Sequence, residues 1–166
     1  MTDHTFPPGP QNERAYRDAL GQFATGVTVI TAAGPDGPVG FTANSFSSVS
    51  LDPALVLWCP AKNAHRFDIF ANAPHFAIHV LREDQADLSQ HFAMNGDDFG
   101  PVDWQADEHG VPLFDTCAAR FNCRLADSHD AGDHVIVVGQ VEDVYLTGAA
   151  PLVFARGGYG HFTPQN

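Results

Sequence analysis

The spacing of apolar residues along the chain predicts a short helix followed by a β-hairpin. Between Glu13 and Ala24, apolar residues recur three and four positions apart, which is typical of an amphipathic helix. They are Tyr16, Ala19, Leu20 and Phe23. The runs 27–33 and 39–46 are strand-like and flank the turn 34–37 (Gly-Pro-Asp-Gly), so we expect two antiparallel strands there.

Five further apolar runs have the length of strands, and two segments have the pattern of short helices. We predict strands at 54–59, 76–81, 121–125, 135–144 and 152–154, helices at 63–71 (capped by Asn63) and 83–93, and a polar loop at 95–110. Because turns join most of the strands, the chain is predicted to be mainly β, an antiparallel barrel with helices outside it. The chain has neither GxGxxG after a strand nor GxxxxGK[ST], which argues against a Rossmann or P-loop nucleotide site.

The length of 166 residues predicts a single domain with a substantial core. We divide the chain into a Pro- and Gly-rich N-terminal arm at 1–12, a barrel domain at 13–162 and a short tail at 163–166. With 44% hydrophobic and 17% charged residues, the composition is that of a globular protein rather than a disordered one.

The net charge of -12 argues against binding to nucleic acid or to an anionic membrane surface, since both need a basic footprint. It does not exclude a small anionic ligand held by a few donors. No apolar run is long enough to span a membrane, and the N-terminus lacks the pattern of a signal peptide. Three cysteines without a CxxC spacing (Cys59, Cys117 and Cys123) indicate reduced thiols, and we expect a cytoplasmic protein.

The stretch from Gly40 to Pro53 is rich in hydroxyl side chains but has no Lys, Arg or Glu, although apolar segments flank it. Its hydroxyl and amide side chains are Thr42, Asn44, Ser45, Ser47, Ser48 and Ser50. Such a stretch is typical either of a buried turn that bonds its own backbone or of a cradle for a polar ligand. The composition of the stretch does not decide between the two.

Two of the eight basic residues, Lys62 and Arg66, follow an apolar strand within five positions, together with Asn63 and His65. Hydroxyls, backbone N–H groups near a helix start and one or two cations could bind a phosphate without a glycine-rich loop. Ordinary surface charges beside a helix are the alternative.

The segment 127–134 (DSHDAGDH) holds two histidines and three aspartates, which are possible ligands of a divalent metal. Its spacing is not diagnostic, and solvated charges in a turn between two strands are the simpler interpretation. A third alternative is that His134, at the start of a strand, points into a ligand cleft.

The segment 156–161 (RGGYGH) could allow a backbone to approach a ligand closely, or could be a flexible tail. No GxSxG motif is present, Cys59 lies in an apolar run, and His79 shares a strand face with apolar residues. We therefore expect Cys59 and His79 to be structural rather than catalytic.

Five segments in the same order resemble the flavin reductase family, the short-chain NAD(P)H:flavin oxidoreductases with a split barrel. They are YRDALGQFATGVTVIT, GFTANSFSSVSLDPALVLWC, HFAIHVLREDQADLSQHFA, HDAGDHVIVVGQVEDV and PLVFARGGYG. The T-x-N-S-F core leading to S-x-D-P, the G-D-H and the Arg-Gly-x-Tyr-type end are the most specific parts of this resemblance. It extends from about Tyr16 to Tyr159.

The resemblance implies a six-stranded antiparallel Greek-key split barrel that forms a homodimer. It also implies FMN or FAD near the dimer interface and NADH or NADPH as the hydride donor. The reaction would be NAD(P)H-dependent flavin reduction that supplies a partner monooxygenase. Two alternatives stay open: an oxidoreductase that retains its flavin and acts on its own substrate, and a flavin-binding protein without turnover.

The resemblance also implies the site residues. The flavin would lie on Thr42, Ala43, Asn44, Ser45, Phe46, Ser47, Ser48, Ser50, Pro60, Ala61, Lys62, Asn63, His65, Arg66 and Phe92. His134, the one residue expected to take part in catalysis, would bind the nicotinamide together with Arg156 and Tyr159.

This chain departs from the family's pattern at three places: Asn63 and His65 replace a Ser and a Thr, Trp58 precedes Cys59, and no arginine precedes Phe92. These departures bear on which flavin is preferred and how tightly it is held.

Overall fold

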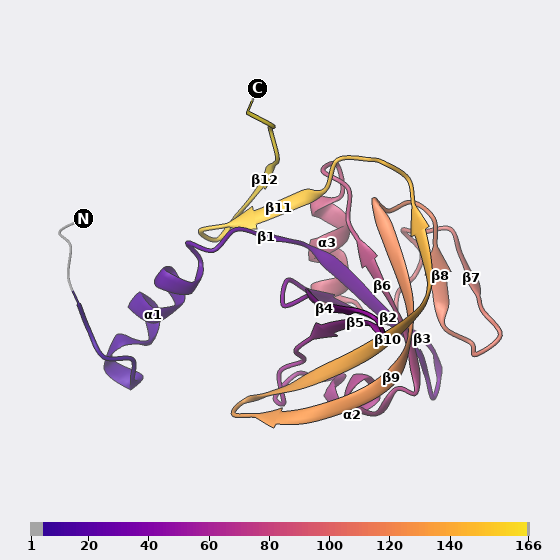
Figure 1. Cartoon of the computed structure of the whole chain (residues 1–166), viewed down its shortest axis with the longest axis horizontal. Coiled ribbons are helices and arrows are strands. Elements are labelled where there is room, and N and C mark those ends of the chain that lie inside the picture. Colours follow the sequence, from indigo (N-terminus) through magenta and orange to yellow (C-terminus); the bar gives the residue numbers. More distant parts are fainter. Residues whose placement is uncertain (1–4, 166) are drawn as a thin grey trace.

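A computed structural model describes residues 5–165, and of the predicted arm and tail, residues 1–4 and 166 lie outside this range. The fold is mainly β, as predicted (Figure 1). Its strands are β1 (Thr25–Gly26), β2 (Thr28–Gly34), β3 (Gly37–Ala43), β4 (Ser47–Leu51), β5 (Ala54–Trp58), β6 (His75–Val80), β7 (Trp104–Ala106), β8 (Pro112–Phe114), β9 (Ala119–Ala131), β10 (His134–Leu146), β11 (Leu152–Ala155) and β12 (Gly158–His161). Its helices are η1 (Pro10–Asn12), α1 (Glu13–Leu20), α2 (Phe67–Asn72) and α3 (Ala86–Met94).

Seven strands, one more than the six expected, form the main sheet in the order β3-β2-β6-β9-β10-β5-β4, and all neighbours are antiparallel. The two edge strands, β3 and β4, are consecutive in the chain and are separated only by residues 44–46. A sheet whose edges are joined by three residues must curl back on itself, as Figure 1 shows. Residues 42–50, where these two edges meet, are called the seam below. The seam is the core of the hydroxyl-rich stretch.

Two groups of buried apolar side chains stabilise the barrel. β2 lies between them, because Ile30 packs with Trp58 and Phe70 whereas its neighbour Val29 packs with Phe92 and Leu152. Burial on both faces explains why β2 reads as a continuous apolar run. Trp58 is fully buried and packs against Phe70 with ring centroids 5.6 Å apart.

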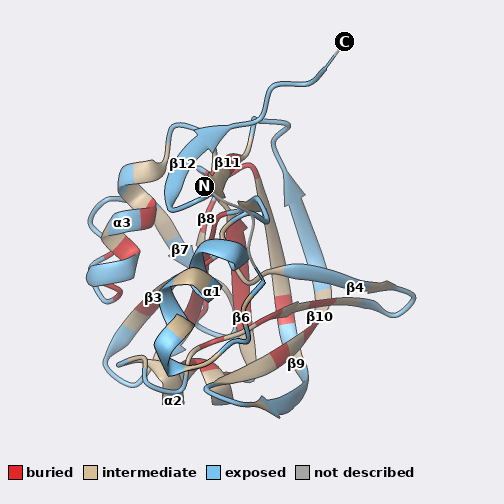
Figure 2. Ribbon diagram, turned by 90° about the vertical axis from the view of Figure 1, so that its left-hand side faces the viewer, coloured by how far each residue is buried: buried red, intermediate tan, exposed pale blue. Residues whose placement is uncertain are grey.

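The helices are shorter than their sequence patterns predict. α1 ends at Leu20 rather than Ala24, and the N–H of Gly21 donates to the carbonyl of Arg17. α2 begins at Phe67 after Arg66, so the predicted start and cap at Asn63 are wrong, because residues 60–62 pair with β10 instead. α3 covers β3 and β2. By contrast, α1 has no buried residue (Figure 2) and stands away from the barrel (Figure 1).

The hairpin of β9 and β10 is much longer than predicted. The polar residues 127–130 belong to β9, and the turn is confined to Gly132 and Asp133, because pairing with the apolar start of β10 keeps the chain extended. Further segments that were not predicted are also strands: β1, β4 in the hydroxyl-rich stretch, β7 in the predicted loop 95–110, β8, and β12, which forms in the segment 156–161 that could have been a flexible tail. The three cysteines are free thiols.

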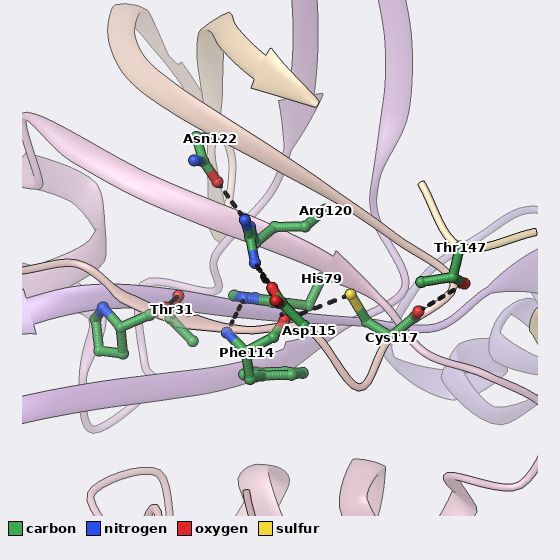
Figure 3. A network of polar contacts seen from close by, with 9 residues as sticks. Thr31, His79, Phe114, Asp115, Cys117, Arg120, Asn122 and Thr147 are labelled. Atoms are coloured by element: carbon green, nitrogen blue, oxygen red, sulfur yellow. Dashed lines mark hydrogen bonds and ion pairs between the residues drawn. The ribbon is translucent and has the colours of Figure 1, made fainter. Parts of the chain in front are cut away.

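His79 is a fully buried histidine whose ring atoms are both hydrogen-bonded. Its Nδ1 lies 3.1 Å from the Val29 carbonyl, its Nε2 accepts the backbone N–H of Phe114 at 3.3 Å, and its ring stacks on Phe114 (Figure 3). Burial, reinforced by the charge of Arg120, lowers the pKa of His79 to about 3 against an opposing hydrogen bond. His79 is therefore neutral and structural, as expected.

Candidate functional site

The seam carries polar side chains of two kinds. The Ser45 hydroxyl accepts the backbone N–H of Cys59 at 2.9 Å and lies 3.3 Å from its carbonyl, so it fastens the seam to the end of β5. By contrast, the side chains of Asn44, Ser48 and Ser50 make no hydrogen bond to any residue in the range 5–165. Asn44 is exposed directly beside Ser45. The seam thus combines fixed hydroxyls with donors and acceptors that a ligand can use.

The remaining residues of the predicted flavin stretch are engaged within the protein. Thr42 donates its hydroxyl to the carbonyl of Ser89 at 2.7 Å, and the carbonyl of Ala43 accepts the Thr28 hydroxyl at 2.6 Å. Phe46 stacks on Phe121 with ring centroids 5.5 Å apart. The Ser47 hydroxyl makes a weak contact of 3.2 Å to the next carbonyl. Their side chains shape the seam more than they offer it free polar groups.

The segment 60–62 continues β5 and lies directly beside the start of β10. The carbonyl of Pro60 accepts the N–H of Val135 at 3.1 Å, Ala61 pairs with His134, and the N–H of Lys62 donates to the carbonyl of Asp133 at 2.8 Å. This pairing brings together two parts of the predicted site: the start of the segment 60–66, which was predicted to bind a phosphate, and His134. Asn63 and His65 are exposed just beyond it.

Lys62 does not point freely to solvent. Its ammonium bonds the carboxylate of Asp130 and the carbonyl of Gly132 at 2.7 Å, and this contact holds the pKa of Asp130 below its usual value. Lys62 is therefore occupied with the turn between β9 and β10. This arrangement does not support a phosphate role for Lys62 as it stands.

Arg66 is the basic residue best placed to bind an anion. It is half-buried, and its Nη2 lies 3.3 Å from the carbonyl of Phe92, while its buried Nε has no hydrogen-bond partner. Its guanidinium packs against Gly96, where a Cβ would come within 2.3 Å of the Arg66 Cζ. A buried guanidinium N–H without a partner is costly, so a ligand anion at this place would be stabilising.

Phe92 has no exposed surface, so it does not offer a ring face to a cofactor in this structure. It packs beneath β3, where a Cβ on Gly40 would lie 2.5 Å from its ring. The backbone N–H of Gly40 also donates to the carbonyl of Gly96 at 2.5 Å. Phe92 and these two glycines set the close approach of α3 to the seam, and sequence reasoning did not single out the glycines.

The residues predicted to bind nicotinamide lie on two separate hairpins. His134 starts β10, and its Nδ1 lies 2.7 Å from the carboxylate of Asp133, which lowers the pKa of Asp133. Tyr159 lies on β12, where its hydroxyl is 2.9 Å from that of Ser89 in α3. Arg156 lies in the turn between β11 and β12, and its N–H donates to the carbonyl of Gly21. Figures 1 and 2 both show these hairpins at different ends of the barrel, so one chain does not bring the three together.

The seam nevertheless links the two ends. Contacts run from Tyr159 through Ser89 to Thr42, and from Ser45 through Cys59 to the segment beside His134. Unpaired hydroxyls and an amide along this line, with the Arg66 guanidinium near it, fit a ligand that has a polyhydroxyl chain and a phosphate. The unpaired side chains of Asn44, Ser48 and Ser50 carry no charge, so they offer such a ligand hydrogen bonds without repelling its phosphate.

Two surface hollows, of about 340 and 400 Å³, lie elsewhere, around β7, β8 and the first turn of α3. They contain none of the predicted flavin residues. Within residues 5–165, no group of three or more His, Cys, Asp and Glu side chains is arranged to hold a metal ion. The histidines and aspartates of 127–134 instead pair locally, as His129 does with Asp127 at 3.4 Å. None of the helices in the described range is long and apolar enough to cross a membrane.

Comparison with known proteins identifies the relatives of this chain. A family model described as a flavin reductase like domain matches residues 20–163. The chain is 52% identical to FMN reductase (NADH) SmoA of Agrobacterium fabrum, over 98% of this chain and 94% of that protein. It is 40% identical to HsaB of Mycobacterium tuberculosis, the reductase subunit of a flavin-dependent monooxygenase, over 92% of this chain and 83% of HsaB.

Solved structures of flavin reductases have the same fold as this chain. The NADH:FAD oxidoreductase SgcE6 of Streptomyces globisporus aligns over all of this chain and 96% of its own, with 35% identity and a TM-score of 0.89. Some relatives are longer, since the chain spans only 49% of the reductase component of the trigonelline monooxygenase of Acinetobacter baylyi. The family model, the sequence identities and the shared barrel agree, and the chain belongs to the flavin reductase family.

Proposed function

We propose that this protein catalyses the NAD(P)H-dependent reduction of FMN or FAD and supplies reduced flavin to a partner monooxygenase. The observation that carries the proposal is the seam, where the side chains of Asn44, Ser48 and Ser50 have no hydrogen-bond partner in the described chain, in a protein of this family. Arg66 has a buried Nε without a partner, and His134 pairs with Ala61 just after β5. Relatives named for FMN with NADH and for FAD with NADH support both flavins and favour NADH as the first donor to test. A structure of SgcE6 with NAD and FAD fragments supports a site for both ligands.

The residues have distinct roles in this proposal. Asn44, Ser48 and Ser50 bind the polar chain of the flavin, and Arg66 neutralises its phosphate. When bound, the flavin takes up the electrons that the reduced nicotinamide gives. His134, oriented by the Asp133 carboxylate at its Nδ1, presents its Nε2 to the nicotinamide and fixes its position.

We also propose that the protein acts as a homodimer in the cytoplasm. Apolar side chains on and after α1 are exposed in the single chain, and Phe23 is 79% exposed. A second copy is the occupant that the proposal assigns to this surface, because one chain leaves its two nicotinamide hairpins apart. The free thiols support a reducing compartment.

The experiment that tests the function is NADH oxidation by the purified protein, with and without added FMN or FAD. The proposal predicts that NADH is oxidised only when flavin is added, and that each protein molecule completes many catalytic cycles. Turnover with flavin that stays bound through gel filtration, and with a non-flavin acceptor, would favour the retained-flavin alternative. Flavin binding with no oxidation under any condition would favour a non-catalytic carrier.

A further inference from the structure

Ser89 is a polar residue on the buried, otherwise apolar face of α3. Its side chain is 1% exposed, and Phe92, one turn later, is fully buried on the same side of the helix. A serine within a helix commonly bonds a carbonyl one turn earlier. The Ser89 hydroxyl instead lies 2.9 Å from the hydroxyl of Tyr159, a residue 70 positions away.

This contact holds a strand that has few other attachments, the nearest being the Arg156 N–H in the turn before it, which donates to the carbonyl of Gly21. In its three-stranded sheet β12 pairs only with β11, and all four of its residues are exposed. β11 is fixed to the barrel through β1 and through the Leu152 N–H, which donates to the carbonyl of Leu81. Within the described chain, the Tyr159–Ser89 hydrogen bond is the side-chain link from β12 to α3. The Tyr159 ring also packs against Phe154 of β11.

Ser89 makes a second hydrogen bond, to a residue of the seam. Its backbone carbonyl accepts the hydroxyl of Thr42 at 2.7 Å. One residue of α3 therefore joins Thr42, at the start of the proposed flavin stretch, to Tyr159, one of the residues proposed to bind the nicotinamide. The two contacts use different atoms of Ser89, so they can be separated by mutation.

We propose that Ser89 is a positioning residue of the nicotinamide side of the site. Its hydroxyl fixes the Tyr159 hydroxyl and so docks the β11–β12 hairpin against α3, beside the seam. This inference rests on the proposed function, because it concerns how the nicotinamide is received. Removing the hydroxyl undocks Tyr159 and leaves the Thr42 contact to the Ser89 backbone in place.

The test compares Ser89→Ala, Tyr159→Phe and the double variant with the wild type. Alanine is a better helix former than serine, so α3 is expected to fold in Ser89→Ala. Tyr145→Phe is the matched control, because it removes a tyrosine hydroxyl from β10 but keeps the ring that packs under Arg120. The expected result is a KM for NADH about fivefold higher in each single variant, the factor that one neutral hydrogen bond provides. The flavin Kd and kcat should stay within about twofold, and the double variant should be no worse than either single one.

A second readout does not depend on activity. Arg156 lies in the exposed turn of the hairpin, so trypsin cleavage after Arg156 in the flavin-free protein reports how firmly the hairpin is docked. Cleavage should be about fivefold faster in Ser89→Ala and Tyr159→Phe and unchanged in Tyr145→Phe.

Wild-type KM and wild-type cleavage in Ser89→Ala would overturn the inference. Equal losses of flavin and NADH binding would also overturn it, because Ser89 would then act on the flavin side. Additive effects in the double variant would show that the two hydroxyls act independently, against the proposal. If the wild type does not oxidise NADH with any flavin, the proposed function fails and the nicotinamide role fails with it, while the cleavage rates still report whether the hairpin is docked.

Discussion

Arg156 has a positive φ of 54° in the two-residue turn between β11 and β12, followed by Gly157 at 79°. A two-residue hairpin turn with positive φ at both positions favours Asn-Gly, because an arginine Cβ is strained in this conformation. A strained residue at an exposed turn is an indication of function rather than of stability. The side chain of Arg156 is therefore the part of this turn that we expect to serve the nucleotide.

Replacing Arg156 with Asn should raise stability and weaken nucleotide binding together. The free energy of unfolding should rise by about 0.5–1 kcal/mol, because Asn tolerates the left-handed conformation better. The KM for NADH should rise severalfold. Urea unfolding and steady-state kinetics measure the two effects, with Arg14→Asn on exposed α1 as the control for charge. Higher stability with an unchanged KM would remove Arg156 from the nucleotide site.

The residues of the seam show what a sequence can predict about a site and what it cannot. The hydroxyl-rich stretch and its link to the 60–66 segment were visible in the residue types. Which hydroxyls are free was not, because Ser45 is fixed by the backbone of Cys59, 14 residues away, and Thr42 by Ser89, 47 residues away. Ser89 could have been noticed as the polar position three residues before Phe92 on a helix, but its partner lies on β12.

At the scale of elements, β6 is held in the sheet partly by a neutral histidine. Because the pKa of His79 is about 3 in the folded protein, protonation favours the unfolded chain, in which the pKa is near its usual 6.5. The unfolded state then binds more protons between these values. The contribution of His79 to stability is complete above about pH 6.5 and is lost as the pH falls towards 3.

We therefore expect the free energy of unfolding to fall with decreasing pH below 6.5, by up to about 1.4 kcal/mol per pH unit from His79 alone. His79→Gln should be less stable at pH 7 but should lose less stability per unit between pH 6.5 and 4.5. Urea titrations at three pH values measure both slopes. Parallel slopes for the two proteins would mean that His79 is not the group that titrates.

Helices and strands were predicted well where the local sequence pattern determines them. They were predicted poorly where pairing with a distant strand determines them. The hairpin of β2 and β3 and the strands β5, β6 and β11 follow from apolar runs and turn residues. The 13-residue strands β9 and β10 do not, because the polar end of β9 is kept extended by the register with its partner. Sequence pattern also could not reveal that His134 and Tyr159 lie at different ends, since the strand order of the barrel decides this.

At the scale of the whole molecule, α1 is an amphipathic helix with no buried residue, and its apolar side chains stay largely exposed in the described chain. Tyr16, Leu20 and Phe23 are 46%, 57% and 79% exposed. Burial of a large apolar side chain contributes about 1.5–3 kcal/mol, so a surface of this kind favours association. The proposed dimer would cover it.

Phe23→Asp should therefore shift the protein from dimer to monomer. Gln105→Asp, which adds the same charge on exposed β7, is the matched control and should stay dimeric. Light scattering after gel filtration measures the mass of each variant. A wild-type monomer, or a Phe23→Asp variant that remains a dimer, would contradict the assignment of this surface to a second copy.

The central claim is that the free polar side chains of the seam bind the flavin, and a flavin titration of two neighbouring variants tests it most directly. Asn44→Ala should raise the Kd for FMN or FAD about tenfold, a loss of ~1.4 kcal/mol, with unfolding unchanged. Ser45→Ala should instead lower the free energy of unfolding by about 1 kcal/mol, because the Cys59 N–H loses its acceptor. An Asn44→Ala variant that binds flavin as the wild type does would contradict the account.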